Sequence, residues 1–451
     1  MLIKYFTKRK LITAAVALIL AAAFLIPSIE KGAASDSADA LSSVKVKSSY
    51  AVVMDANSGN ILYDKGGDET IYPASTSKIL TCIVAIENSD MDDIVTVSQN
   101  ALKGQENNGA HIGLKAGEKL TMKDALYAMM LESANDAAIA IAESISGSEE
   151  EFAKLLNEKA KELGLENSHF VTPNGLFDDE HYTTAKDLAI ITKYAMENEE
   201  FLKIFSAYKY IMSPTNMRSD ELDIYTSHKM TKYKSMEYDG IIGGKTGYIE
   251  ESKCNVVTAA ERNGIKLICV TAKCDNIIDA YNDSTKLLDS SFENYSKVKI
   301  SASENQEKFE DMLKSSNYKI KHSSISDDDL SAVIPKDADV SQITYKIKEE
   351  KTSYPVKEGD VTGKLQILYD GNIVGTADIT ADKDLSFWGY AMSIAVKVIL
   401  AIAILLIITI VVLRIYFTSK RKRKNLSTII VESIFLAYDK PILKSIPGMP
   451  S

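Results

Sequence analysis

Histidine, cysteine and tryptophan are scarce in this 451-residue chain, with five, four and one copies respectively. No histidine lies in a His-Glu-x-x-His or nucleophile-elbow sequence, so the common histidine-based hydrolase motifs are excluded. No spacing of cysteine and histidine matches a metal site, so we expect neither a metal nor a cofactor. Any serine chemistry in this chain therefore requires a base other than histidine.

Four cysteines are too few for a disulfide-dense scaffold. Cys82 falls inside a predicted helix, where we expect a small buried side chain. Cys254, Cys269 and Cys274 flank a predicted hairpin whose turn is Asn263-Gly264. A strict two-residue turn leaves Cys254 and Cys274 one position out of register, and a bulge is needed to align them. We therefore expect free thiols, with a Cys254–Cys274 disulfide as the alternative.

Positive charge is outnumbered by negative charge in the body of the chain. The whole sequence has 52 Lys and Arg against 62 Asp and Glu, a net charge of −10. Residues 1–40 hold five basic and three acidic side chains and residues 397–451 hold nine and two, which leaves 38 against 57, or −19, for 41–396. A body this acidic argues against nucleic acid as a partner.

Two apolar runs, one near each end, predict membrane signals. Residues 1–40 combine a basic start, an apolar run and small residues around Ala38-Asp39-Ala40, which is typical of a secretory signal peptide. Residues 388–417 form a second apolar run with aromatic residues at both ends, including the only Trp, and a basic cluster follows it. This pattern predicts a single transmembrane helix, with residues 418–451 as a cytoplasmic tail and residues 41–385 outside the cell membrane.

The length predicts two or three domains, and the composition, 45% hydrophobic and 25% charged, is that of a globular protein. Within residues 41–295, strand patterns at both ends enclose helical patterns. The helices are expected at 75–87, 121–146, 149–163, 184–197 and 277–294, and the hairpins at 50–55/61–63 and 254–261/265–272. We expect an α+β domain in which the terminal strands share one antiparallel sheet. Residues 296–385 predict a separate small β domain with a turn at Asp370-Gly371.

Lysine is the alternative base, and its signature is Ser-x-x-Lys. The pattern recurs along the chain, for example at Ser206 and Lys209, but only Ser75 and Lys78 open an apolar-periodic helix. A separation of three residues places Ser75 beside Lys78 on one helical face. In the first turn the amide of Ser75 has no partner within the helix, so it is free for a developing oxyanion. A partly buried lysine near another cation has a lowered pKa and can take the serine proton.

Two further motifs lie in the same predicted domain, Ser133-Ala-Asn135 and Lys245-Thr-Gly247. Lys-Thr-Gly occurs only once in the sequence. Ser-x-x-Lys, Ser-x-Asn and Lys-Thr-Gly together form the set used by β-lactamases and penicillin-binding proteins. With these motifs in order, and with Asp239–Tyr248 leading into the third, the chain resembles the penicillin-binding D-Ala-D-Ala carboxypeptidases over about 45–295. The resemblance implies a β-lactamase/DD-peptidase-like fold, in which an antiparallel sheet packs against a helical cluster.

The resemblance also implies catalytic roles for the first two motifs. Ser75 is expected to be the acylated nucleophile and Lys78 its general base. Ser133 is expected to relay a proton, and Asn135 to hold the substrate amide.

The third motif is expected to bind the substrate. Lys245 adds positive potential, which lowers the pKa of Lys78 and attracts the terminal carboxylate of the substrate. Thr246 binds the same carboxylate. Gly247 precedes Tyr248, whose backbone amide is expected to complete the oxyanion hole with that of Ser75.

The implied reaction is removal of the terminal D-Ala from peptidoglycan stem pentapeptides, with β-lactam antibiotics as covalent inhibitors. A DD-endopeptidase or a β-lactamase with the same site is an alternative, and so is a non-catalytic penicillin-binding sensor module. The sequence departs from the family pattern where an Arg often helps to bind the carboxylate, because only Lys273 is present to take that role. For His111, His169 and His181 we expect structural roles.

Overall fold

The structure, a computed structural model, describes residues 41–325, 330–350 and 352–438. The predicted signal peptide, residues 1–40, lies outside the described residues. The chain forms two compact units, made of the described parts of Met1–Glu304, Asp327–Lys348 and Leu365–Ala377, and of Asn305–Ser326, Glu349–Lys364 and Asp378–Ser451. Because this division places parts of 296–385 in both units, the domain boundary near residue 295 stays a prediction.

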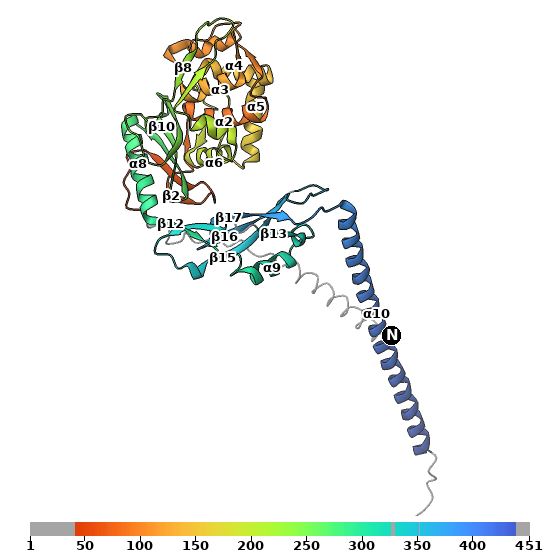
Figure 1. Cartoon of the computed structure of the whole chain (residues 1–451). Helices are drawn as coiled ribbons and strands as arrows, with labels where there is room; N and C mark the ends of the chain where they lie inside the picture. The colour runs from red at the N-terminus through yellow and green to blue at the C-terminus, as the bar shows by residue number, and fades with distance from the viewer. Residues whose placement is uncertain (1–40, 326–329, 351, 439–451) are drawn as a thin grey trace, which may run out of the picture. The chain divides into compact units, whose positions relative to one another are not determined.

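A five-stranded antiparallel sheet forms the centre of the first unit (Figure 1). Its strand order is β2-β1-β11-β10-β9, and all registered neighbours run antiparallel. The strands are β1 Tyr50–Asp55, β2 Ile61–Lys65, β9 Ile241–Ile249, β10 Lys253–Arg262 and β11 Ile265–Cys274. Strands from the two ends of the segment thus share one sheet, which confirms the predicted α+β arrangement.

Each face of this sheet is covered by helices (Figure 1). Alternate residues of a strand point to opposite faces, and Val53 packs with helix α8 Ile277–Asn294 while Val52 packs with the helical cluster. That cluster contains α2 Lys78–Glu87, α3 Met122–Leu131, α4 Asn135–Ser146, α5 Glu149–Glu162, α6 Ala185–Ala195 and α7 Glu199–Phe205. The sheet therefore has two buried faces, and its strands read as nearly continuous apolar runs.

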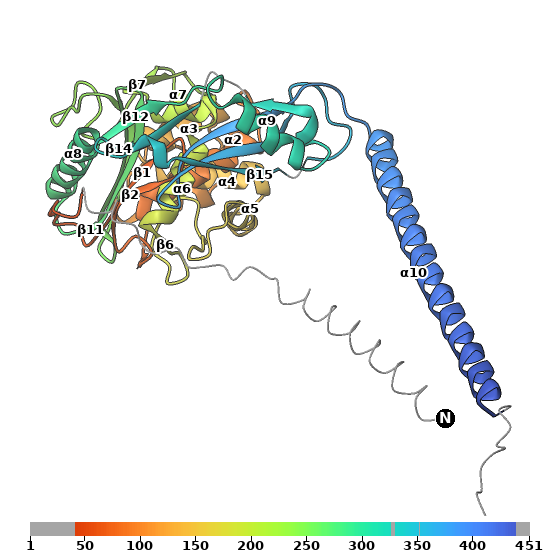
Figure 2. The same ribbon diagram turned by 90° about the horizontal axis from the view of Figure 1, so that it is seen from below.

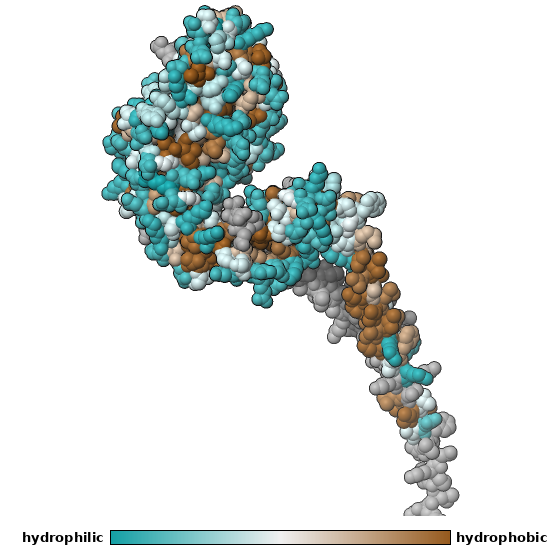
Figure 3. All heavy atoms as spheres, in the orientation of Figure 1, coloured by the Kyte–Doolittle hydropathy of each residue, from teal (hydrophilic) through white to brown (hydrophobic). Residues whose placement is uncertain are grey.

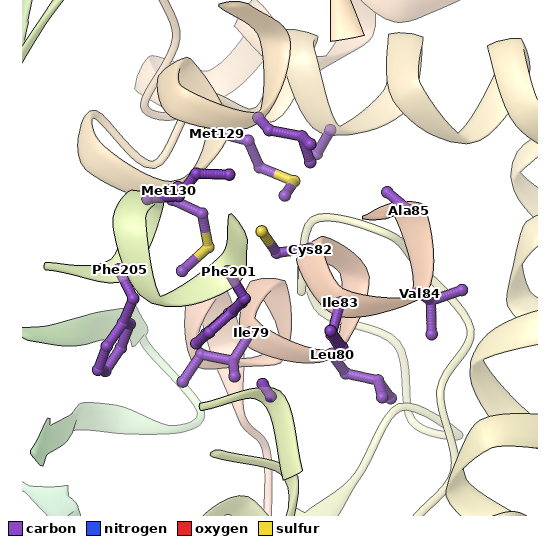
Figure 4. Close-up of a cluster of buried hydrophobic side chains, with 14 of the residues drawn as sticks. Ile79, Leu80, Cys82, Ile83, Val84, Ala85, Met129, Met130, Phe201 and Phe205 are labelled. Carbon is purple, nitrogen blue, oxygen red and sulfur yellow. The ribbon is translucent and has the colours of Figure 1, made fainter. Parts of the chain in front are cut away.

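Helix α2 lies in the middle of the cluster and is buried along almost its whole length. Figure 4 shows Ile79 and Cys82 among Met129, Met130 and Phe201 of the neighbouring helices. Burying each large apolar side chain contributes about 1.5–3 kcal/mol. Cys82 is a small buried side chain, as predicted, and burial raises the pKa of its thiol. This packing fixes the position of the first residues of α2.

The single helix predicted over 121–146 is wrong, because the chain forms the two helices α3 and α4 there. Ser133 has a φ of 62°, which a helical residue does not adopt. The Ala134 N–H donates to the Ala128 carbonyl at 3.2 Å and closes α3. Four of the five residues 132–136 are polar, and this interruption of the apolar pattern coincides with the break.

Other elements agree with the predicted ranges or add to them. The helix expected over 75–87 begins as a 3₁₀ turn, η2 Ala74–Ser77, before α2. Short elements that were not predicted include α7, the 3₁₀ helix η3 Asn100–Asn108 and three two-stranded ribbons. The ribbons pair β3 Thr70–Ile71 with β6 Thr183–Thr184, β4 Ile94–Thr96 with β5 Lys119–Thr121, and β7 Lys209–Met212 with β8 Leu222–Tyr225.

The predicted β character of residues 296–385 is confirmed. One sheet pairs β12 Tyr295–Lys299 with β14 Ser331–Pro335. A four-stranded sheet has the order β13-β17-β16-β15, with β13 Ser323–Ile325, β15 Thr344–Glu349, β16 Val361–Tyr369 and β17 Asn372–Ala381. Asp370 and Gly371 have φ of 49° and 77°, which fits the expected tight hairpin turn. Helix α9 Gln306–Ser315 completes this region.

A long helix, α10 Phe387–Tyr438, follows the β strands (Figure 2). Its part Phe387–Thr418 has the length and composition to cross a membrane, and no residue of its most apolar 18-residue stretch is buried in the described structure. Figure 3 shows apolar side chains gathered on this part of the helix. The helix continues beyond the predicted span of 388–417 into the tail.

Asp283 of α8 accepts hydrogen bonds from the segment just before β1. Its Oδ2 atom accepts hydrogen bonds from the backbone N–H groups of Lys47 and Ser48, at 2.8 and 2.7 Å, and from the Ser48 hydroxyl at 2.8 Å. Asp283 and Ser48 are both fully buried. Without this carboxylate the three donors would have no acceptor.

We expect Asp283→Ala to lower the free energy of unfolding by about 2–4 kcal/mol, because it leaves buried donors unsatisfied. Thermal unfolding of the full chain in detergent measures the change. Asp279→Ala, one turn earlier on the same helix, is the matched control. It removes an exposed ion pair with Lys47 and is expected to cost about 1 kcal/mol or less. Equal losses in the two variants would contradict the assignment.

Candidate active site

Ser75 and Lys78 lie side by side at the start of α2. Ser75 belongs to η2 and is half-buried, whereas Lys78 is the first residue of α2 and is fully buried. The Lys78 Nζ atom donates to the Ser75 Oγ atom at 2.8 Å. The Ser-x-x-Lys motif is therefore a hydrogen-bonded pair in the structure.

The amine of Lys78 has two further partners from distant parts of the chain. Nζ donates to the Asn135 Oδ1 atom at 2.8 Å and to the Asn174 carbonyl oxygen at 2.6 Å. Asn135 is the first residue of α4, and Asn174 lies in the segment before β6. Three separate segments thus meet at one nitrogen atom.

Two glycines allow the backbone to pack closely around Ser75. A Cβ atom on Gly247 would lie 2.8 Å from the Pro73 carbonyl oxygen and 2.9 Å from the Ser75 nitrogen. On Gly175, which has a φ of 79°, a Cβ atom would lie 2.0 Å from the Ala74 carbonyl oxygen. Any side chain at these positions would push β9 or the segment around residue 175 away from η2.

The second motif is placed by the break between α3 and α4. The Asn135 N–H donates to the Ala110 carbonyl at 2.8 Å. The Asp136 Oδ2 atom accepts from the Leu114 N–H and from the Gln105 side-chain amide, both at 3.0 Å. These bonds fasten the segment 105–114 to the start of α4, so this segment forms one wall of the site.

The third motif lies on β9, the edge strand of the central sheet. Lys245 is fully buried, and its Nζ atom donates to the Ser133 Oγ atom and to the Thr246 carbonyl, both at 2.9 Å. Lys245 therefore connects the third motif to the second, as Lys78 connects the first motif to the second.

Burial shifts the pKa values of both lysines. Desolvation, followed by the nearby positive charge of Lys245, lowers the pKa of Lys78 well below its ordinary value, although Asp136 acts in the opposite direction. Desolvation lowers the pKa of Lys245 from 10.5 to about 7. The lowered pKa of Lys78 favours its neutral form, which can accept a proton, and a pKa of about 7 leaves Lys245 part of its charge near neutral pH.

A cleft of about 650 Å³ opens over these groups. Six residues that were predicted to act at the site line it: Ser75, Ser133, Asn135, Thr246, Gly247 and Tyr248. Lys78 and Lys245 lie buried beneath, within hydrogen-bond distance of two of the lining serines. The ring of Tyr248 is 64% exposed. The structure therefore brings all eight predicted residues together.

Lys273 lies outside the described lining of the cleft. It lines a separate small pocket with residues such as Tyr72 and Glu251. Its φ of 53° marks a bulge in β11, and this bulge puts the residue in that other pocket. The geometry therefore gives no support for Lys273 as the residue that binds the substrate carboxylate.

The histidine contacts agree with the predicted structural roles. His181 is buried, and its Nδ1 atom accepts from the N–H groups of Val171 and Thr172, each at 3.1 Å. Burial lowers the pKa of His181 to about 4. The His169 Nδ1 atom lies 2.6 Å from the Glu180 carbonyl oxygen, and His111 is exposed.

Sequence reasoning missed several residues of the site. The Asn174 carbonyl was missed because any residue type has one, although its Pro-Asn-Gly context indicates a turn. Asp136 follows the second motif directly and was not considered. The cleft is also lined by Glu132, Ser227, Asp275 and Asn276, for which the sequence carries no signal.

A family comparison covers more than half of the chain. The model of the peptidase S11 family, described as D-alanyl-D-alanine carboxypeptidase, matches residues 35–276. The chain is 30% identical over 357 residues to the D-alanyl-D-alanine carboxypeptidase DacF of Bacillus subtilis, which covers 75% of this chain and 86% of that protein. It is 26% identical over 343 residues to DacA of Haemophilus influenzae, covering 74% and 84%.

Solved structures show the same fold. The DD-transpeptidase of Streptomyces K15 superposes with a TM-score of 0.52 and 28% identity, over 55% of this chain and 98% of that chain. The D-alanyl-D-alanine carboxypeptidase DacD of Francisella tularensis has a TM-score of 0.55 and 23% identity, over 76% and 94%. These similarities confirm the expected DD-peptidase-like fold.

We expect Lys245→Met to stabilise the protein by on the order of 1–4 kcal/mol below pH 7, because a buried charge is removed. Between pH 7 and 10.5 the unfolded wild type binds the Lys245 proton and the folded state does not, so wild-type stability rises with pH over that range. The gain should therefore shrink as the pH rises. Thermal unfolding at pH 6 and pH 9 tests this expectation, with the exposed Lys119→Met as control. A larger gain at pH 9 would contradict it.

Proposed function

The chain belongs to the D-alanyl-D-alanine carboxypeptidase family of serine peptidases, and we propose that Ser75 is the residue that becomes acylated. Its activity is that of a serine-type D-Ala-D-Ala carboxypeptidase, a hydrolase. The substrate proposed for it is the peptidoglycan stem pentapeptide, from which it removes the terminal D-Ala. Within the family activity, we assign the steps of the reaction to particular atoms of this chain.

The partners of Lys78 carry this proposal. Asn135 Oδ1 and the Asn174 carbonyl can only accept hydrogen bonds, and a neutral amine has two N–H groups to give them. The Ser75 Oγ atom lies 2.8 Å from Nζ. In the neutral form the direction of this bond is proposed to reverse, so that the Ser75 hydroxyl donates its proton to the lone pair of Nζ. The neutral form of Lys78 is thus fully satisfied only when it acts as the acceptor for Ser75.

The reaction then follows in two steps. The Ser75 Oγ atom attacks the carbonyl carbon of the penultimate D-Ala while Lys78 takes the hydroxyl proton. The peptide bond breaks, and Ser133 relays the proton that Lys78 took from Ser75 to the nitrogen of the leaving D-Ala. Water then adds to the ester, which frees the shortened peptide and restores the hydroxyl. A β-lactam ring is expected to acylate Ser75 by the same attack.

The third motif would hold the substrate during this reaction. Two of the three N–H groups of a charged Lys245 have partners in the described chain, at Ser133 and Thr246. The third is proposed to attract the carboxylate of the terminal D-Ala, together with the Thr246 hydroxyl. The close approach of Gly247 to η2 brings the amide of Tyr248 toward that of Ser75, and these two amides are proposed to form the oxyanion hole.

Helix α10 is proposed to anchor the enzyme in the cell membrane, with the catalytic region on the extracytoplasmic side. The basic cluster Lys420–Lys424 follows the apolar part of the helix, and a basic flank favours the cytoplasm. An enzyme placed in this way would work next to its peptidoglycan substrate.

We expect Ser75→Ala to lose labelling by a fluorescent penicillin and to release D-Ala from a stem pentapeptide at least about 10³-fold more slowly than wild type. Ser206→Ala, an exposed serine in a second Ser-x-x-Lys pattern, is the matched control and should keep both activities. Labelling that survives in Ser75→Ala would refute the nucleophile assignment. Rapid penicillin hydrolysis without D-Ala release would indicate a β-lactamase, and cleavage of cross-linked dimers alone would indicate an endopeptidase.

A protease added outside intact cells is expected to remove residues 41–385 and to leave the tail after Phe417 protected. Antibodies against an epitope on each side of α10 would detect the fragments. Cells opened with detergent provide the control, because both epitopes should then be lost. Protection of the catalytic region in intact cells would overturn the orientation.

A further inference from the structure

Two cysteines face each other at the end of the β10–β11 hairpin, next to the catalytic cleft. Cys254 of β10 and Cys274 of β11 are direct partners in the sheet register. Residues directly opposite in an antiparallel pair have Cα atoms about 4.5–5.5 Å apart. Disulfides join Cα atoms about 4.4–6.8 Å apart, so this register is compatible with a bond.

A bulge produces this alignment. Val256 pairs with Thr271 and Cys254 with Cys274, so two steps on β10 match three on β11. Lys273 has a φ of 53°, and its N–H donates to the Asn255 side-chain oxygen at 2.9 Å. The bulge is therefore held by a specific bond and is not a loose end of the strand.

The two side chains also point to the same face of the sheet. Cys254 and Cys274 belong to the apolar cluster on the α8 face, whereas Val257 and Ala272 belong to the cluster on the opposite face. The two thiols are only 6% and 2% exposed. Burial, followed by the nearby Cys274, raises the pKa of the Cys254 thiol, which agrees with two sulfur atoms lying close together.

We propose that Cys254 and Cys274 are a redox-active pair that forms a cross-strand disulfide when the protein meets an oxidant of the disulfide class. Each thiol loses its proton, one Sγ–Sγ bond forms, and two electrons pass to the oxidant disulfide, which is cleaved to two thiols. Cys254 lines the cleft, so an oxidant can reach it first, and Cys274 then resolves the mixed disulfide. The free thiols of the structure are the reduced state of this pair.

The bond would act on the strand that carries the oxyanion amide. Cys254 pairs with Tyr248 of β9 on one side and with Cys274 on the other. A disulfide closes the loop between residues 254 and 274, which restricts the unfolded chain and stabilises the hairpin. The oxidised protein should therefore have the more firmly fixed cleft edge.

The test uses the purified full chain in detergent at pH 8.5 with oxidised glutathione as the oxidant. Remaining thiols are blocked with N-ethylmaleimide after denaturation, and intact mass counts them. We expect two of the four thiols to be lost. Trypsin should then release residues 254–262 joined to 274–286, and reduction should separate them. The Tm should be higher for the oxidised protein than for the reduced one.

Three variants make the result specific. Cys82→Ser and Cys269→Ser should still yield the joined peptide, because both residues lie elsewhere in the core. Cys274→Ser should instead stop at a glutathione adduct on Cys254. If wild type also stops at that adduct, or if all four thiols still react with N-ethylmaleimide, the proposal is overturned. These measurements do not depend on enzyme activity, so they stand apart from the test of Ser75.

Discussion

The buried amine of Lys78 is the interaction on which the rest of the catalytic region depends. A buried amine without hydrogen-bond partners is costly, because its polar N–H groups have lost their hydrogen bonds to water. Its three partners come from residues 75, 135 and 174, which belong to η2, α4 and the segment before β6. The chain must therefore join these segments to satisfy the lysine, and the same joining assembles the proposed nucleophile and base. Folding and site assembly are one process here.

Lys245 is the second buried lysine that needs a partner. The break between α3 and α4 supplies that partner, Ser133. Continued helix would carry Ser133 along the α3 axis, whereas its φ of 62° turns the chain so that Oγ meets Lys245 Nζ at 2.9 Å. A non-glycine residue in this conformation costs about 1–3 kcal/mol. The bond to a buried lysine offsets that cost. The strained Ser133 and the buried Lys245 thus stabilise each other, in a region whose stability comes from the apolar packing around α2.

Features that depend on fixed sequence spacing could be predicted, and features that depend on tertiary contacts could not. Ser75 and Lys78 are neighbours in any helical turn, so their pairing followed from the sequence. The Asn174 carbonyl has no side-chain signature, and the φ of Ser133 that turns the chain at the break depends on its tertiary contact with Lys245. The pocket that Lys273 lines could not be predicted, because this residue lies at a one-residue bulge in the strand pairing. The alignment of the two hairpin cysteines depends on the same bulge.

The charge distribution explains why the site relies on buried cations. Residues 41–396 carry a net charge of −19, so the protein surface does not steer a carboxylate-bearing peptide toward the cleft. Surface charges are largely screened beyond about 8–10 Å at physiological salt, whereas buried charges are screened much less. A lysine such as Lys245, fully buried beneath the cleft, therefore retains its attraction at the short distance at which the substrate carboxylate is proposed to bind. An acidic protein can therefore still recognise a carboxylate, because the attraction to the buried lysine acts over the short distance of direct contact.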